Sequence, residues 1–292
     1  MKKSFLVLSL ATCMFAKDIV FTYVKSPLNV PSIVEKHKAI FAKHFAPDTV
    51  KYSELTAGPK QTSALASGDI DFLFAVGATS VFLAASNGLD IGIINAYSRA
   101  PEAYNLISKQ KLDTIKGKKI AGPKGTILHE LLLAYLKKEG LSIKDVEYYP
   151  MDIPAAAAAL ASGKIDVAML AGPHAYTNLK NGYHKVCDGN GLILPLVVNA
   201  SKKDVDKELL KKFKLAQKEI LNTMKNDEKQ SLEYAMIETK LDEQSVKDMY
   251  VMYDFSSQIT QEDIKSMQKT IDFMYENQMI KNKLDPKELI IK

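Results

Sequence analysis

Short apolar runs alternate with longer segments of helical periodicity along about two thirds of the chain. The run FLFAVG at 72–77 is apolar at every position, which indicates a strand buried on both faces, as in a parallel sheet covered by helices. This alternation predicts an α/β fold built on doubly wound parallel sheets. The other expected strands lie at 18–24, 50–55, 91–97, 118–122, 146–150, 165–172 and 192–198.

The expected helices carry start and stop signals. Ser32 and Glu35 have the spacing of a capping box, which predicts a helix from Ser32 to about Phe45. A second helix begins near Pro59 and ends at Gly68, where glycine can take the left-handed conformation. Residues 204–292 are rich in Lys and Glu and predict helices without further strands.

One helix-glycine-strand unit occurs twice. The stretch ALASGDIDFLFAVG at 64–77 returns as ALASGKIDVAMLAG at 159–172, with an offset of 95 residues at both ends. In each copy Ser-Gly closes the helix, Ile packs inward, Asp begins the strand and Gly marks its carboxyl end. The sequence therefore predicts one such unit in each of two α/β lobes, a duplication of architecture that does not by itself define a function.

The first sixteen residues have the composition of a cleavable export signal. Lys2 and Lys3 precede an apolar run from Phe5 to Phe15, and Ala16 ends it. We therefore expect residues 1–16 to be a signal peptide and the protein to be periplasmic. The tetrapeptide ending at Cys13 is a near match to a lipoprotein box. The alternative is therefore a lipid anchor at Cys13, which would also be compatible with a surface-attached interaction protein. No later run reaches the roughly 18 apolar residues of a membrane span.

Composition limits the remaining 276 residues to one large core or two moderate lobes. Without the two signal lysines the net charge falls from +5 to +3, too mild and too dispersed for a nucleic-acid partner. Cys187 is the only cysteine outside the signal, so no internal disulfide can form and the core must be substantial. We expect a monomer.

Catalytic and metal-binding patterns are missing from the sequence. The helix at His129 lacks the second histidine of a zinc site, and AGPKGT at 121–126 lacks the frame of a phosphate-binding loop. Cys187 is best interpreted as a small buried hydrophobe. We expect no enzyme activity, no metal and no cofactor. The histidines stand at 37, 44, 129, 174 and 184.

Two loops at strand carboxyl ends carry the candidate chemistry, because open α/β sheets bind ligands there. Thr79 and Ser80 follow one strand, and Gly125 and Thr126 follow another. Each loop opens a helix whose first N–H groups favour a sulfonate, phosphate or carboxylate. Two such helix starts that face each other would clamp a small anion, whereas ordinary N-capping is the equal alternative for Thr79, Ser80 and Thr126.

Three further residues are candidates for the same cleft. Asn29 lies in a loop bracketed by prolines, where a plain turn residue is the alternative. His174 follows Gly172-Pro173 at the end of a strand in the second lobe. Arg99, the only arginine of the chain, stands where the chain should cross between lobes. Its planar fork suits an oxyanion, and an interlobe salt bridge is the alternative.

In combination these segments resemble the nitrate/sulfonate/taurine family of periplasmic substrate-binding proteins of ABC importers. The resemblance covers about residues 18–200 in order. The segments that carry it are YVKSPLNVPSIVEK, ALASGDIDFLFAVGATS, AYSRAPEAYNLISK, LDTIKGKKIAGPKGTILHELLLAYLKKEGLSIKDVEY and AAAALASGKIDVAMLAGP.

The resemblance implies a type II periplasmic binding-protein fold, in which two lobes with mostly parallel sheets flanked by helices are joined by two crossing strands. It implies a first lobe at 17–98 and 196–292 and a second lobe at 99–195, with the C-terminal helices packed on the first. It also implies a closing cleft and delivery of the ligand to a membrane permease. The residues it places on cleft-facing loops are Asn29, Thr79, Ser80, Gly125 and Thr126.

The expected ligand is a small organic anion, an aliphatic sulfonate or a relative such as taurine or nitrate. The family also includes binders of thiamine pyrimidine precursors, for which Tyr23 or Tyr97 could supply a stacking ring, although the chain has no Trp. An enzyme on the same architecture, such as a pyrimidine synthase, is the alternative from another class. The export signal and the missing His/Cys constellation disfavour it.

Overall fold

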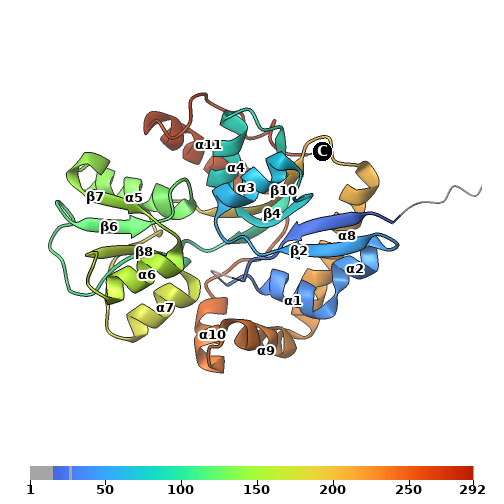
Figure 1. Ribbon diagram of the computed structural model, residues 1–292, viewed down its shortest axis with the longest axis horizontal. Helices are drawn as coiled ribbons and strands as arrows, with labels where there is room; N and C mark the ends of the chain where they lie inside the picture. The colour runs from blue at the N-terminus through green and yellow to red at the C-terminus, as the bar shows by residue number, and fades with distance from the viewer. Residues whose placement is uncertain (1–15, 26–27, 292) are drawn as a thin grey trace, which may run out of the picture.

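The computed structural model describes residues 16–25 and 28–291. Within these residues the chain forms two five-stranded sheets that lie side by side (Figure 1). The first sheet has the order β2 (Thr49–Ser53), β1 (Asp18–Thr22), β3 (Phe72–Gly77), β10 (Leu196–Lys202) and β4 (Ile91–Arg99). The second has the order β7 (Glu147–Pro150), β6 (Lys119–Gly122), β8 (Val167–Ala171), β5 (Tyr104–Ser108) and β9 (His184–Asp188). Residues 1–15 of the expected signal, including Cys13, lie outside the described range.

Each sheet with the helices that cover it is called a lobe below. The helices are α1 (Val30–Lys38), α2 (Ile40–Phe45), α3 (Gly58–Ser67), α4 (Ala78–Ser86), α5 (Ile127–Lys138), α6 (Ile153–Ala161), α7 (Gly172–Lys180), α8 (Lys207–Asn226), α9 (Glu228–Thr239), α10 (Glu243–Tyr250) and α11 (Gln261–Glu276), with short 3-10 turns at Pro101–Ala103 and Ile143–Asp145. None of the helices in the described ranges is both long and apolar enough to cross a membrane.

The α/β prediction is confirmed, and the sheets are mixed. In the first sheet β1 is parallel to β2 and β3, whereas β10 runs antiparallel to β3 and β4. The second sheet repeats this pattern, with β5 as its antiparallel insert. The inserts β5 and β10 each enter a sheet directly after the chain has crossed from the other lobe. Strand β3 is apolar at every position because both of its faces are buried. A mixed sheet buries a central strand in this way just as a parallel sheet does.

The duplicated unit has the same role in both sheets. Gly68 and Gly163 end their helices with positive φ angles of 84° and 71°. The strand-initiating Asp71 accepts a hydrogen bond from the N–H of Val20 through Oδ2 at 2.8 Å. Asp166 accepts one from the N–H of Lys119, also at 2.8 Å. Each Asp thereby fixes the register of its strand against the neighbouring parallel strand, which explains why the unit is repeated.

The predicted capping box at Ser32 is wrong. The helix begins at Val30, with Asn29 in the N-cap position three residues before Ser32, and Ser32 is buried inside the helix. Glu35 turns inward and accepts hydrogen bonds from the Phe41 N–H at 3.0 Å and the Tyr52 hydroxyl at 2.7 Å. Ala39, at φ 50°, divides the expected single helix into α1 and α2.

A cluster of stacked aromatic rings fixes the C-terminal part of the chain to the first lobe. Phe21 of β1 stacks on Phe41 with ring centroids 4.1 Å apart, and on Phe72 of β3 at 5.2 Å. Phe213 of α8 stacks on Phe72 at 5.1 Å and on Phe41 at 5.6 Å. All four rings are fully buried. Because α8 follows β10, this cluster brings the helices that continue the chain back over the first sheet (Figure 1).

We predict that Phe213→Ala lowers the free energy of unfolding by about 3–5 kcal/mol, because it removes a fully buried ring from a packed cluster. Leu215→Ala on the same helix is the matched control, since Leu215 is half exposed and should change stability by less than about 0.5 kcal/mol. Urea denaturation of the two variants measures the difference. Equal losses would contradict the role assigned to the cluster.

Candidate functional site

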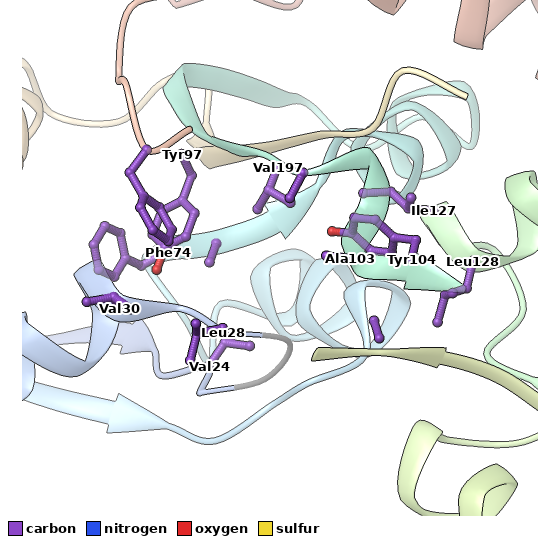
Figure 2. Close-up of a cluster of buried hydrophobic side chains, with 14 of the residues drawn as sticks. Val24, Leu28, Val30, Phe74, Tyr97, Ala103, Tyr104, Ile127, Leu128 and Val197 are labelled. Carbon is purple, nitrogen blue, oxygen red and sulfur yellow. The ribbon is translucent and has the colours of Figure 1, made fainter. Parts of the chain in front are cut away.

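A cavity of about 120 Å³ lies between the two lobes. The first lobe contributes Val24, Asn29, Thr56, Ala57, Gly58, Gln61, Ala75, Gly77, Ser80 and Val197. The second contributes Tyr104, Pro123, Thr126, Ile127, Leu128, Asp152, Ile153, Pro154, Ala171 and His174. Much of this lining is apolar, and Figure 2 shows Tyr104, Ile127, Leu128 and Val197 within the buried cluster that continues from it.

Six helices begin at this cavity. Their N-cap residues all belong to its lining, and within the described residues none of these N-cap side chains accepts a hydrogen bond from its own helix. The helices α8 to α11 differ, because each begins at an Asp or Thr whose side chain does cap it. The N-cap residues at the cavity are Asn29, Ala57, Gly77, Thr126, Asp152 and Ala171.

The first-turn N–H groups of a helix have no carbonyl partner within that helix. Proline in the first turn of α1, α3, α6 and α7 removes one such donor from each of these helices. The helices α4 and α5 have no proline there and keep all their donors. The strongest donor sets at the cavity therefore come from the helix starts after Gly77 and Thr126, one in each lobe.

The described residues that line the cavity include no cationic side chain, because there is no Lys and no Arg among them. Asp152 is its one acidic residue, and Lys60 of α3 neutralises it across the cleft, with Nζ 2.8 Å from Oδ2. Burial lowers the pKa of His174, so its imidazole is neutral at pH 7. Backbone N–H groups and helix dipoles supply the positive potential instead.

The two predicted loops meet each other directly. The Ser80 hydroxyl donates to the Gly125 carbonyl at 2.9 Å, which joins the start of α4 to the loop before α5. Gly125 has φ +72°, and a Cβ there would lie 2.9 Å from Leu83 of α4. A Cβ on Gly77 would lie 3.2 Å from Ile127. The glycines thus allow the close approach of the two lobes beside the cavity.

The structure brings four of the seven predicted site residues to the cavity: Asn29, Ser80, Thr126 and His174. Thr79 and Gly125 lie beside it without lining it. Thr79 instead donates to Glu130 at 2.8 Å, and Gly125 supports Ser80. Both residues make contacts between the lobes, and a ligand contact by either of them stays a prediction.

Arg99 also lies outside the cavity lining. Its Nε and Nη2 both donate to the Asp263 carboxylate at 2.6 Å, and Nη1 lies 3.3 Å from Asp254. The remaining donors reach Ser256 and Gln258. The guanidinium is fully engaged in fastening the end of β4 to the start of α11. Within the described residues the ion pairs of Arg99 are to Asp254 and Asp263, so the alternative of an interlobe salt bridge is not formed, and a ligand contact of Arg99 stays a prediction.

The proposed stacking tyrosines also lie elsewhere. Tyr23 and Tyr97 are buried and do not line the cavity, and the Tyr97 hydroxyl accepts the Ser32 N–H at 3.1 Å. The aromatic side chain that does line it is Tyr104. The ring of Tyr97 packs against Phe74 instead, at 5.2 Å between centroids (Figure 2).

Sequence reasoning missed several lining residues. Ala75 has φ 74° in the middle of β3, an unusual conformation for a residue with a Cβ, and no sequence signal announces it. Gln61 is 1% exposed, and its Nε2 is fixed on the Leu55 carbonyl at 2.8 Å while its Oε1 has no partner. The sequence did contain a signal for Ala57 and Asp152. Proline in the second position of α3 and α6 indicates a helix start, and these two residues are the N-caps of those helices.

No catalytic constellation surrounds the cavity. Within the described ranges no group of His, Cys, Asp and Glu side chains could hold a metal ion. Burial raises the pKa of the Cys187 thiol to about 12, so it is not a nucleophile at neutral pH. Burial also lowers the pKa of His129 to about 4, and its ring stacks on Tyr148. The arrangement can bind a ligand, and these groups provide no activated nucleophile.

A sequence model of the NMT1/THI5-like family matches residues 49–231, more than half of the chain. A candidate aliphatic sulfonates-binding protein of Bacillus subtilis is 26% identical over 274 residues, which cover 89% of this chain and 82% of that protein. A candidate binding protein of Brucella abortus is 32% identical over 136 residues. That match covers 46% of this chain and only 41% of the relative's length.

The fold matches a solved structure of the alkanesulfonate-binding protein SsuA from Xanthomonas axonopodis pv. citri bound to MOPS. The TM-score is 0.84 and the identity 22%, with 94% of this chain and 97% of that chain covered. The chain therefore has the two-lobed periplasmic binding-protein fold, as predicted.

We predict that Gly125→Ala lowers stability more than Gly140→Ala. Both glycines have positive φ, which costs an alanine about 1 kcal/mol. Only at Gly125 would the new methyl group also meet a side chain of the opposite lobe, whereas Gly140 faces open space. Thermal denaturation of both variants measures the difference. Equal decreases in melting temperature would show that the close approach of the lobes at Gly125 does not contribute to stability.

Proposed function

Since the chain belongs to the NMT1/THI5-like family, we propose that it is the solute-binding receptor of an ABC importer. It would close its interlobe cavity on a small organic anion, an aliphatic sulfonate or a related compound, and deliver it to a membrane permease. The names of its relatives support this reading, because the Bacillus subtilis protein is described as binding aliphatic sulfonates. A periplasmic location, with the export signal at 1–16, is part of the proposal.

The observation that carries the proposal is the convergence of six helix starts without side-chain caps on one cavity. The partial positive charge of each helix start favours an anion. A sulfonate offers three acceptor oxygens and stays ionised at every physiological pH. Such a ligand can use donors from both lobes at once, so its binding favours the closed arrangement.

The apolar part of the lining suits the rest of such a ligand. Tyr104, Ile127 and Ile153 belong to the second lobe, and Val24 and Val197 face them from the first. A short aliphatic chain would bury its surface there and gain about 25 cal/mol for each Å² removed from water. A bare inorganic anion such as nitrate would leave this surface unused, which favours an organic one.

A thiamine pyrimidine precursor is the second candidate, and Tyr104 is the observation that favours it, since an aromatic ring in the lining could contact a heterocycle. The same fold also hosts enzymes. A pyrimidine synthase activity is disfavoured here because neither Cys187 nor His129 lines the cavity and their pKa values keep them inactive.

We expect a thermal-shift panel to separate these ligands, because a compound that binds only the folded form raises the melting temperature. The panel contains alkanesulfonates of increasing length, taurine, nitrate, bicarbonate and pyrimidine precursors. Alkanesulfonates should give the largest shift and nitrate a smaller one. A shift from pyrimidines alone would replace the proposed ligand class, and no shift from any compound would remove the proposal.

A paired substitution tests the sign of the ligand charge. Thr56 is exposed at the edge of the cavity, so a longer polar side chain can be placed there without disturbing the core. Thr56→Glu should weaken an anionic ligand by about threefold to tenfold through charge repulsion, and the effect should shrink at high salt. Thr56→Gln, of the same size and neutral, is the control. Calorimetric titrations in which both variants bind equally would contradict an anionic ligand.

A further inference from the structure

Glu130 is a buried carboxylate in the joint between the lobes. It projects from α5 of the second lobe and is 5% exposed. One oxygen accepts the Thr79 hydroxyl of α4 at 2.8 Å, and the other accepts the Thr270 hydroxyl of α11 at 3.0 Å. A single side chain thus connects the second lobe to a helix of the first lobe and to the C-terminal helix packed on it.

No charge compensates this carboxylate in the described part of the chain. The groups that face it are Thr79 and Phe82 from α4, Leu194 and Leu196 from the crossing segment, and Ser266, Met267 and Thr270 from α11, all of them uncharged. They enclose about 10 Å³, space for one water at most. The sequence of α4 contains no titratable residue.

Other charged groups on the packed elements are engaged elsewhere or exposed, as Lys265 and Lys269 of α11 are. On α11, Asp263 is paired with Arg99, and Glu276 at the exposed far end lies 3.2 Å from Lys137 of α5. The neighbouring His129 points its Nδ1 at the Gly125 N–H and stacks on Tyr148. The cost of burying the Glu130 charge is therefore offset only by two hydroxyl donors.

The joint is continuous with the cavity. Thr126, the N-cap of α5, lines the cavity one helical turn before Glu130. On the other side Thr79 lies between the cavity-lining Gly77 and Ser80. Any motion that draws α5 away from α4 separates Glu130 from Thr79 and admits water to the carboxylate.

We infer that Glu130 is a positioning residue that couples closure of the two lobes to the uptake of one proton, so that the closed, ligand-holding form is favoured at acid pH. The part of this inference that concerns ligand affinity rests on the proposed function. The part that concerns closure does not, because it also applies to the ligand-free protein.

The direction follows from burial. With α5 in contact with α4, as in this structure, burial raises the pKa of Glu130 from its ordinary 4.5 to about 7, while the two hydroxyl donors lower it in part. Below pH 4.5 the group is protonated in both forms and does not affect closure. Between about pH 4.5 and 7 closure becomes less favourable as pH rises, and above the upper value the penalty is constant.

Glu130→Gln tests the inference, because the amide keeps the shape and can still hydrogen-bond to both threonines. Small-angle scattering of the ligand-free wild type should show a larger radius of gyration at about pH 8 than at about pH 5.5. The affinity for the best compound of the thermal-shift panel should fall about tenfold over the same range, with net proton uptake on binding. Glu130→Gln should abolish both pH effects.

Glu276→Gln is the matched control. It removes an exposed carboxylate at the same α5–α11 contact and should keep the pH profile of the wild type. Thr270→Val provides a second variant that keeps Glu130. The loss of one hydroxyl donor should raise the pKa of Glu130 further, so the ligand affinity of this variant should fall by a larger factor than that of the wild type between about pH 5.5 and pH 8. An unchanged pH profile in Glu130→Gln, or a wild type without one, overturns the inference. If no panel compound binds, the proposed function fails while the scattering comparison still decides the role of Glu130.

Discussion

The hydrogen-bonding demand of helix N-termini is the constraint on which the site depends. A buried helix start must find acceptors for its first N–H groups, and most helices meet this demand with their own N-cap side chain. The C-terminal helices do so with Asp206, Asp227, Asp242 and Thr260. The helices that begin at the interlobe cavity have no such side-chain cap, and α4 and α5 also have no proline in their first turn, which supports the proposal that a ligand accepts hydrogen bonds from their first N–H groups.

The duplicated architecture explains why these helix starts meet. In each lobe a helix follows the carboxyl end of a central strand, after Gly77 in β3 and after Ala171 in β8. The inserts β10 and β5 then connect the two sheets so that these ends face each other. Opposed strand ends place the positive ends of helices on both sides of one cavity.

Charges in this protein are used mainly to hold elements together and not to contact a ligand. Arg99 fixes α11 to the end of β4, Lys60 holds Asp152 across the cleft, and Glu130 joins three helices. Apart from Asp152, which Lys60 neutralises, the described cavity lining consists of apolar groups and polar groups without a formal charge at pH 7. The proposed anion would therefore be held there without a strong ion pair.

The sequence by itself determined the α/β class, the duplicated unit and the two glycine-rich corners, because these depend on local properties: apolar runs, Gly68 and Gly163 at helix ends, and small residues before helix starts. It did not determine that Arg99 is engaged by Asp263, that Ala75 takes a positive φ, or that Glu130 is buried between the lobes. Those outcomes depend on residues far apart in the sequence, such as Arg99 and Asp263, and on the packing of whole elements. A local sequence pattern determines where a helix begins. Only the tertiary structure determines which side chains from distant parts of the sequence contact that helix.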